Sequence, residues 1–203
     1  MTGLRERKKQ QTRERLVAAA GRLFTRDGFQ ATTMEEIADA AEVSVATLYN
    51  YYGTKNTLLL AHISSRVATM MEDGQKILAA PPPHPAEAVQ ALAGAYLDGF
   101  LGLERELLRE TFAAGFSPAS EVLPELIGMD ELLVGQLAAL LGPYYESGQL
   151  SVDAAAAVVL LYSILVTQLI MYVSAETATS ASVRKAVTHQ IEVAFSGLRA
   201  QER

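Results

Sequence analysis

The segment that decides the fold spans residues 32–55 and reads TTMEEIADAAEVSVATLYNYYGTK. Its first half predicts a short helix, because Thr33 is a favourable N-cap and Glu36, three residues later, can complete a capping box. Apolar residues then recur at i, i+3, i+4 and i+7, which places them on one helical face. These residues are Met34, Ile37, Ala38 and Ala41.

A second short helix follows a tight turn at Glu42-Val43. Ser44 is its expected N-cap, and the helix includes residues 45–51. Leu48 and Tyr52 fall on the inner face. The outward face carries small or polar residues: Ala46, Thr47 and Asn50. A short helix of this kind, braced by another helix, is what a helix-turn-helix inserts into the DNA major groove.

The segment and its flanks resemble the DNA-binding domain of TetR-type transcriptional regulators from roughly Arg13 to Leu60. The matching positions, in order, are Leu23-Phe24-x-x-x-Gly28-Phe29, Thr32-Thr33-x-x-x-Ile37-Ala38, Val43-Ser44 and Leu48-Tyr49-x-x-Tyr52-x-x-Lys55-x-x-Leu58. Two places depart from the family pattern. Glu42 stands where glycine is frequent, and Tyr51 and Tyr52 stand where His and Phe are common.

Charge is unevenly distributed along the 203 residues, although the net charge is −6. Residues 1–26 hold eight Lys/Arg against two Asp/Glu, whereas residues 56–203 hold eight against sixteen. A basic end on an acidic body predicts that a polyanion binds at one end only. The absence of cysteine and of an apolar amino-terminal segment is consistent with a cytoplasmic protein.

The periodicity predicts an all-α chain of about nine helices without a strand of useful length. Residues 1–8 read as a mobile basic arm, and a first helix follows to about Asp27. Thr54 is expected to cap a long helix that ends near Ala79, before the prolines at 81–85. Later helices are expected at Ala86–Leu103, Glu104–Phe116, Pro124–Ser147 (with a kink at Gly142-Pro143), Asp153–Ala175 and Ser180–Arg199. Residues 1–53 are predicted to form the three-helix DNA-binding domain, and residues 54–203 a larger effector-binding and dimerisation domain.

Residues 154–173 contain no charged side chain and are long enough to span a bilayer. Ser163, Thr167 and Gln168 interrupt the segment, and no flanking Lys or Arg sets an orientation. A buried or interface helix is therefore preferred to a membrane span.

DNA recognition needs phosphate contacts for position and base contacts for sequence. The predicted DNA-binding residues are Thr33, Ser44, Val45, Ala46, Thr47, Tyr49, Asn50, Tyr51 and Lys55. The resemblance implies that Lys55, at the start of the long helix, contacts the DNA backbone. Asn50 suits adenine, and Val45 or Ala46 suits a thymine methyl. Tyr52 is expected to pack, and Tyr51 is equally compatible with packing or DNA.

The resemblance also implies a small-molecule effector, which we expect to be largely apolar or aromatic. Candidate pocket residues are the large apolar and few polar side chains of the second half: His62, Met70, Tyr96, Phe100, Phe112, Phe116, Met129, Tyr144, Tyr162, Gln168, Met171 and Tyr172. For any one of them, ordinary core packing is the stronger expectation. A hydrogen bond within the core or between subunits is an equal reading of Gln168. Arg105 and Arg109 are expected to pair with Glu106 and Glu110.

The last two helices are expected to form a homodimeric four-helix bundle, as the resemblance implies. The patch assigned to it on the first of these helices combines the small residues Ala154, Ala155, Ala156, Ala157 and Ser163 with the large residues Leu161, Leu165 and Leu169. The partner stripe on the second helix is Val183, Val187, Ile191, Ala194, Phe195 and Leu198. His62, His84 and His189 show no metal-ligand spacing, and no catalytic motif, metal or cofactor is expected. The predicted function is a ligand-responsive, dimeric, operator-binding repressor. A DNA-binding protein without an effector and a membrane-anchored regulator are the alternatives.

Overall fold

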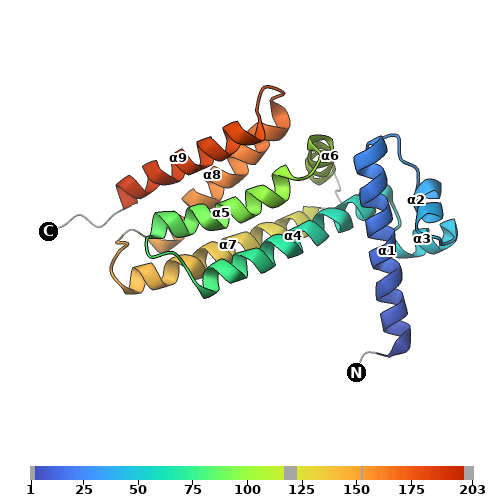
Figure 1. The fold of residues 1–203 in the computed structure, drawn as a ribbon, viewed down its shortest axis with the longest axis horizontal. Helices are drawn as coiled ribbons and strands as arrows, with labels where there is room; N and C mark the ends of the chain where they lie inside the picture. The colour runs from blue at the N-terminus through green and yellow to red at the C-terminus, as the bar shows by residue number, and fades with distance from the viewer. Residues whose placement is uncertain (1–2, 117–122, 152, 199–203) are drawn as a thin grey trace. The chain divides into compact units, whose positions relative to one another are not determined.

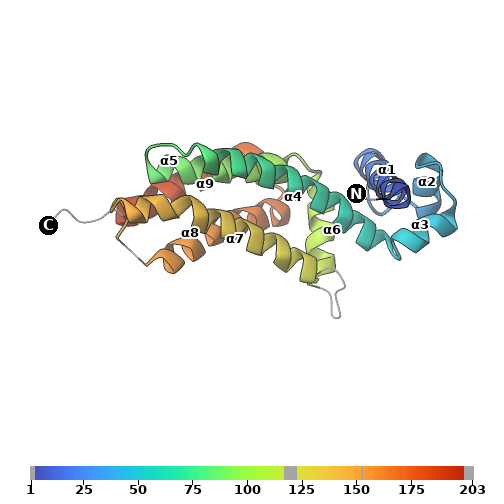
Figure 2. The same ribbon diagram turned by 90° about the horizontal axis from the view of Figure 1, so that it is seen from below.

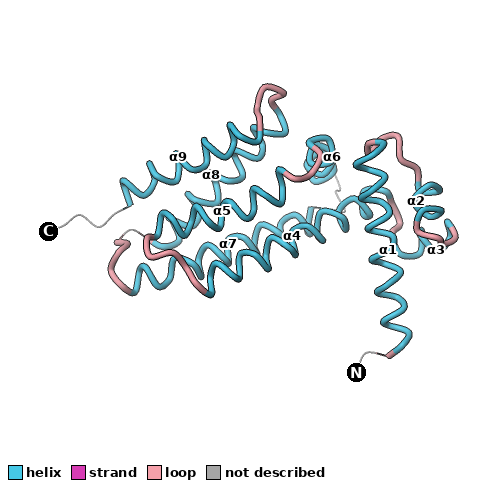
Figure 3. The backbone as a smooth tube through the Cα atoms, in the orientation of Figure 1, coloured by secondary structure: helices cyan, strands magenta, loops and turns pink. Residues whose placement is uncertain are grey.

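The computed structural model describes residues 3–116, 123–151 and 153–198. Over these ranges the chain forms nine helices and no strand (Figures 1 and 3). The helices are α1 (Leu4–Asp27), α2 (Met34–Ala40), α3 (Val45–Tyr51), α4 (Lys55–Ala79), α5 (Pro85–Leu101), α6 (Arg105–Gly115), α7 (Leu123–Glu146), α8 (Ala154–Ser174) and α9 (Ser180–Leu198). The all-α prediction is confirmed.

The chain divides into two compact units. The amino-terminal unit comprises Met1–Arg66 and Glu106–Leu126, and the carboxy-terminal unit comprises Val67–Arg105 and Ile127–Arg203. α6 therefore groups with the helix-turn-helix, although it lies far along the chain. This grouping differs from the predicted single boundary at residue 54.

The amino-terminal unit is built on the apolar stripe of α1. Leu16, Ala20 and Phe24 are buried there, together with Ile37 of α2 and Leu48 of α3. α1 begins at Leu4, so the prediction of a mobile arm over residues 1–8 is wrong from that residue onward. Most residues between Leu4 and Arg15 are strong helix formers, which explains why the helix continues outward from its packed part.

The carboxy-terminal unit contains the α8–α9 hairpin, and α5 packs against α9 (Figures 1 and 2). α5 begins with Pro85 at a position where its missing N–H costs no helical hydrogen bond. α7 continues through Pro143 to Glu146. α8 and α9 bury large apolar side chains, including Leu161 and Ile191, within their own unit, so these side chains are not available to a partner subunit.

Two of the described helices are long and apolar enough to cross a membrane, namely Leu123–Glu146 and Ala154–Ser174. Length and composition are the only basis for this match. The core helix of a soluble protein passes the same test.

Candidate functional site

The first helix of the helix-turn-helix is fixed at its start by a reciprocal capping box. The Thr33 N–H donates to Glu36 Oε2 over 2.8 Å, and the Glu36 N–H donates to Thr33 Oγ1 over 3.2 Å. The hydrogen bonds from the Thr33 backbone and hydroxyl lower the pKa of Glu36. The predicted cap is confirmed.

The turn between α2 and α3 places Glu42 in the left-handed region, with φ of +52°. The Glu42 N–H donates to Asp39 O over 2.9 Å, and the Val43 N–H donates to Ala38 O over 3.0 Å. These two bonds form a Schellman motif, in which glycine is the usual residue at the left-handed position. The Arg15 guanidinium of α1 donates to the carbonyl oxygen of Ala41 and pairs with the Glu42 carboxylate over 3.4 Å.

α3 presents one face to solvent. Ser44 caps the helix by accepting the Thr47 N–H over 3.1 Å, and Leu48 anchors the inner face because it is fully buried. Ala46, Tyr49 and Asn50 are exposed, with Tyr49 at 48%. Val45, Thr47, Tyr51 and Tyr52 are half-buried. Burial raises the pKa of Tyr52, which fits its expected packing role. The outward face therefore has the composition and exposure expected of a base-reading surface.

Lys55 is engaged with its own chain. Its ammonium donates to the carbonyl oxygens of Phe29 (2.7 Å), Gln30 (3.3 Å) and Thr32 (2.9 Å). The same Nζ atom lies 4.5 Å from the centroid of the Phe29 ring. The predicted phosphate contact stays a prediction, because the three contacts in this structure are intramolecular.

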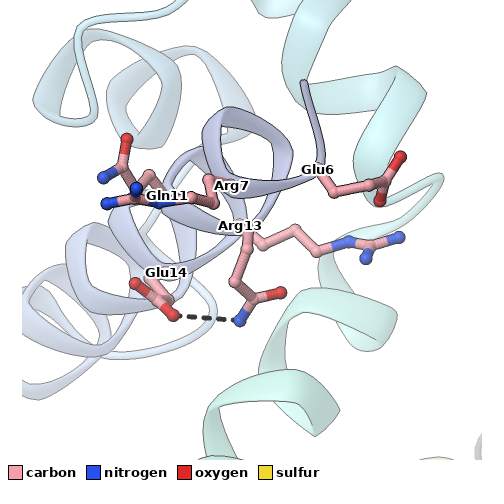
Figure 4. Close-up of a pocket in the computed structure, with 6 residues that line it drawn as sticks. Glu6, Arg7, Gln11, Arg13 and Glu14 are labelled. Carbon is pink, nitrogen blue, oxygen red and sulfur yellow. Dashed lines mark hydrogen bonds between the residues drawn. The ribbon is translucent and has the colours of Figure 1, made fainter. Parts of the chain in front are cut away.

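Basic side chains surround the exposed turns of α1. Arg5, Arg7, Lys8 and Lys9 are all exposed. Figure 4 shows the Arg7 and Arg13 side chains extending in opposite directions from α1. The Gln10 side-chain amide donates a hydrogen bond of 3.0 Å to the Glu14 carboxylate. The Arg13 guanidinium lies 5.9 Å from the Tyr51 ring centroid. A positive surface of this kind attracts phosphates without reading sequence.

A shallow groove runs between α1 and α4 within the amino-terminal unit, with a volume of about 760 Å³. Val17, Leu60 and His62 are among its lining residues. The His62 ring packs where Gly21 lacks a side chain, since a Cβ there would lie 2.4 Å from His62 Cε1. Burial, followed by the charge of Arg66, lowers the pKa of His62. The contact with Gly21 agrees with core packing, which was the stronger expectation for His62.

The candidate pocket residues fall in both units. His62, Phe112 and Phe116 belong to the amino-terminal unit, and the others belong to the carboxy-terminal unit. Met70, Tyr96, Tyr144 and Tyr172 are buried; His62, Phe100, Phe112, Met129, Tyr162 and Gln168 are half-buried; Phe116 and Met171 are exposed. Gln168 Nε2 donates to Gln190 Oε1 of α9 over 3.3 Å, which is the intrachain alternative considered for this residue.

A buried polar cluster joins α4, α5 and α7 in the carboxy-terminal unit. Gln136 is 3% exposed; its Oε1 accepts the Tyr96 hydroxyl over 3.1 Å, and its Nε2 donates to Met71 O over 2.9 Å. Burial raises the pKa of Tyr96 to about 12. The sequence prediction missed Gln136. The available signal was a polar residue beside Leu137 in the inward stripe of α7.

Two further polar contacts involve α8. Burial and the neighbouring Asp130 carboxylate of α7 raise the pKa of Tyr162. Burial raises the pKa of Asp130. Arg105 stacks 4.3 Å from the Tyr172 ring centroid and donates to Ala175 O (3.1 Å), beyond the end of α8. The expected pairing of Arg105 with Glu106 or Glu110 is therefore wrong, because the guanidinium caps a helix end instead. Arg109 does pair with Glu106, over 3.2 Å.

The predicted dimer stripes pack inside the chain. Leu161, Leu165, Leu169, Val183, Val187, Ile191 and Phe195 are all buried, Ala194 is half-buried, and the Leu198 side chain lies outside the described residues. Assigning these large residues to a partner was wrong, because they are buried within the chain's own carboxy-terminal unit. The small residues Ala154, Ala155, Ala156 and Ser163 of the predicted patch are exposed, and Ala157 is buried. Large apolar residues remain exposed on other faces of the hairpin: Val159, Leu160, Ile170, Met171 and Val193.

Comparisons with known proteins agree with the helix-turn-helix geometry. Residues 16–62 match the family described as bacterial regulatory proteins, tetR family. The chain is 35% identical over 96 residues to the HTH-type transcriptional regulator TcmR of Streptomyces glaucescens, covering 46% of this chain and 39% of TcmR. It is 40% identical over 80 residues to BetI of Rhizobium meliloti, covering 39% of each protein. The matches thus span about two fifths of these relatives.

A solved structure extends the similarity beyond the amino-terminal unit. The fold is similar to that of Thermus thermophilus FadR, a TetR-family transcriptional repressor crystallised with lauroyl-CoA, with a TM-score of 0.73 and 27% identity. The match covers 94% of this chain and 97% of FadR. The helix-turn-helix and the match over residues 16–62 identify this segment as a DNA-binding domain of the TetR family of bacterial regulatory proteins, and the chain as a whole has the fold of a TetR-family repressor.

Proposed function

We propose that the protein is a dimeric, DNA-binding transcriptional repressor whose operator affinity is lowered by a small, largely apolar effector. The observation that carries the proposal is the outward face of α3. Ala46, Tyr49 and Asn50 are exposed there above the buried Leu48, on a helix capped by Ser44. These side chains can form hydrogen bonds and methyl contacts with base edges.

The charge distribution supports DNA as the partner. The basic residues of α1 flank the helix-turn-helix, whereas residues 56–203 are acidic. Lys and Arg side chains that neutralise phosphates release counterions, so we expect operator affinity to fall steeply with salt concentration. The acidic remainder would be repelled by DNA and favours binding through one end of the chain.

The effector class is proposed from the buried surface of the carboxy-terminal unit and from one relative. Aromatic and methionine side chains line the interior of that unit, including Met70 and Tyr96. FadR of T. thermophilus was crystallised with lauroyl-CoA. Long-chain acyl thioesters are therefore the first ligands to test, with the free fatty acids of the same chain lengths, which lack the coenzyme A group, as the matched series.

A homodimer through the α8–α9 hairpin is proposed on a face different from the predicted stripes. Val159 and Val193 are 60% and 57% exposed, and Ile170 and Met171 extend the apolar surface along α8. Exposed apolar residues grouped on two adjacent helices are typical of a subunit interface. Two helix-turn-helix units are needed to read a palindromic operator.

A cytoplasmic location follows from this proposal, and an apolar α8 is accounted for by the interface. The membrane-anchored alternative predicts that the protein requires detergent. Recovery of the protein in the supernatant after ultracentrifugation, without detergent, would exclude that alternative.

Selection of binding sites from a random DNA pool tests the proposed function. We expect a palindromic site, bound by the parent protein and released when lauroyl-CoA or a related acyl thioester is added. Failure to enrich any sequence would refute DNA recognition. Enrichment with no release by the acyl thioesters or the fatty acids would favour a DNA-binding protein without an effector of this class.

A further inference from the structure

The Gln136 side chain ties α7 to the backbone of α4 inside the carboxy-terminal unit. Its Nε2 donates to the carbonyl oxygen of Met71 over 2.9 Å, and its Oε1 accepts the Tyr96 hydroxyl over 3.1 Å. Gln136 is 3% exposed, and it is the only amide or charged side chain that is buried in the described part of this unit. Breaking its bonds would leave buried polar groups unpaired, so the contact is costly to open.

A glycine makes this contact possible. Met71 and Gly74 are three residues apart on α4, so they lie on the same face of the helix. A Cβ at Gly74 would lie 2.1 Å from Gln136 Oε1, 2.8 Å from Cδ and 2.9 Å from Nε2. The whole amide group therefore occupies the place of the missing side chain, where glycine permits close approach to the backbone. We call the contacts of Gln136 with Gly74, Met71 and Tyr96 the Gln136 anchor.

A second contact fixes the same stretch of α4 along its axis. Met70 is 2% exposed, and its side chain fills the space beside Gly99 of α5. A Cβ at Gly99 would lie 2.3 Å from Met70 Cε and 2.4 Å from Met70 Cγ. Near Met70 and Gly74, α4 therefore inserts one side chain into α5 and receives one from α7. A slide of α4 by one residue, about 1.5 Å, would take both contacts out of register.

The Gln136 anchor joins two helices that continue from one unit of the chain into the other. The chain passes between its units inside α4, at residues 66–67, inside α7, at residues 126–127, and at the first residue of α6. Met71 follows the crossing in α4, and Gln136 follows the crossing in α7. The bond between them therefore fixes the two helices, within the carboxy-terminal unit, from which the chain continues to the helix-turn-helix unit.

We propose that Gln136 is a positioning residue, which fixes α4 against α7 and thereby sets the half-site spacing that the dimer accepts. The proposal rests on the proposed function of operator binding by a dimer. Half-site spacing follows from the geometry of the protein that carries the two reading helices. The bases chosen within each half-site depend instead on the side chains of α3, which the Gln136 anchor does not touch. Spacing preference and base preference are therefore separate readouts.

Three substitutions separate positioning from a contribution to stability alone. Gln136→Met keeps an unbranched side chain and removes both hydrogen bonds. Gly74→Ala displaces the amide from the α4 side. Tyr96→Phe removes one buried hydrogen bond but leaves the bond from Gln136 to Met71 that joins α7 to α4. All three are expected to lower stability, and only the first two break the tie between the helices.

Gln75→Met and Gly135→Ala are the matched controls. Gln75 is an exposed residue of α4, and Gly135 is an exposed residue of α7. A Cβ added at Gly135 would have no atom within 4 Å. Both controls are expected to keep the spacing preference of the parent.

Fluorescence anisotropy measures binding to the selected palindrome and to the same half-sites moved one base pair closer together or farther apart. Each variant is measured at a temperature where circular dichroism shows it folded. For Gln136→Met and Gly74→Ala, the ratio of affinities for the parental and altered spacings is expected to fall at least about fivefold, comparable to the effect of one mismatched base pair. Tyr96→Phe should keep the parental ratio. A parental ratio in Gln136→Met, an equal fall in Tyr96→Phe, or a changed base preference within the half-site would overturn the positioning role.

A measurement without DNA keeps this inference separate from the proposed function. Amide hydrogen exchange over residues 67–79 is expected to be faster in Gln136→Met than in the parent and in Gln75→Met, because α4 loses its tie to α7. Unchanged exchange would overturn the positioning role even if the dimer binds a palindrome. If Gln136→Met does not fold, Gln136→Leu, which also lacks both hydrogen bonds, is compared in the same two assays. A parent protein that selects no DNA site would instead refute the proposed function, and the exchange comparison would decide whether Gln136 fixes α4.

Discussion

The Gln30 side-chain amide donates a 2.6 Å hydrogen bond to the Glu110 carboxylate, although the two residues are separated by 80 positions in sequence. The bond ties the α1–α2 loop to α6, so the base of the helix-turn-helix is supported by a helix from a distant part of the chain. Gln30 contributes its side chain to this contact, and its carbonyl oxygen accepts a hydrogen bond from the Lys55 ammonium.

Substitution of both partners of this bond should reveal their coupling. We expect Gln30→Ala and Glu110→Ala each to lower the free energy of unfolding, and the double variant to lose about 0.5–1 kcal/mol less than the sum, as expected for a solvent-exposed hydrogen bond to a carboxylate. Urea unfolding of the four proteins gives the coupling energy. Strict additivity would mean that the bond contributes nothing in solution.

Glu42→Gly should stabilise the amino-terminal unit. The φ of +52° at this position is costly for a residue with a Cβ and free for glycine. The substitution also removes the exposed Arg15–Glu42 pair, which contributes little because both side chains are well solvated. Relief of the left-handed conformation is worth about 1–2 kcal/mol, and the greater entropy of glycine in the unfolded chain offsets about 0.4–1 kcal/mol of it. The net gain expected in urea unfolding is therefore about 0.5–1 kcal/mol. Glu42→Val serves as the control in the opposite direction. A β-branched residue is strained more than glutamate in the left-handed region, so this variant should be less stable than the parent.

Gly74→Ala should disrupt the buried cluster around Gln136. A Cβ at Gly74 would lie 2.1 Å from Gln136 Oε1, and the amide cannot move without losing its bonds to Tyr96 and Met71. The expected loss in the free energy of unfolding is about 1–3 kcal/mol, the cost of leaving buried polar groups unpaired. Gly135→Ala is the matched control, because Gly135 is an exposed position of α7 and a Cβ added there would have no atom within 4 Å. The control should gain about 0.5–1 kcal/mol from helix propensity.

His62 should make stability sensitive to mild acid. Its pKa in the folded protein lies below the ordinary value of 6.5, so the unfolded chain binds the proton more readily. Its contribution is fully present above about pH 6.5 and is lost as pH falls below that value toward the folded pKa. Thermal unfolding from pH 7.5 to 5 should show a smaller decline for His62→Phe, which keeps a flat ring against Gly21. Equal declines in variant and parent would contradict the buried neutral state.

Charge substitutions on α9 should distinguish its two faces. Ile191 is 1% exposed, so Ile191→Glu buries a carboxylate and should unfold the carboxy-terminal unit. Val193 is 57% exposed, so Val193→Glu should retain the helical circular dichroism and reduce the solution mass toward the 21.9 kDa of one chain. Sedimentation equilibrium measures the mass. A Val193→Glu protein with the parent's mass would move the interface to another surface.

Local spacing predicted the features that depend on neighbours in sequence. The Thr33–Glu36 capping box, the Ser44 cap and the exposed face of α3 are all set within one or two helical turns, so residue order was sufficient. Arg105 was expected to pair with a carboxylate and instead donates to a backbone carbonyl 70 residues away. Lys55 and Arg15 also donate to backbone carbonyls, 23 and 26 residues away, and the sequence predicted neither contact. Such acceptors belong to the backbone and leave no mark in the sequence.

The prediction of the dimer interface was wrong for a different physical reason. α8 is apolar around most of its circumference, with Leu161 buried inside the chain and Val159 exposed only two positions away. Periodicity identifies an apolar face but not the partner that covers it. Here α8 packs against α9, and α5 packs against α9, within the same chain. Gln136 was missed because a polar residue in an apolar stripe is identified by its partners, Tyr96 and Met71, which come from two other helices.

The grouping of α6 with the helix-turn-helix has a consequence for transplanting DNA specificity between relatives. A graft cut after residue 66 would carry Gln30 into its new host without Glu110, and the loop beneath the reading segment would meet a foreign surface. In this protein the transferable head is encoded in two separate stretches, residues 1–66 and 106–126. A chimaera that preserves operator choice therefore needs both stretches from the same parent.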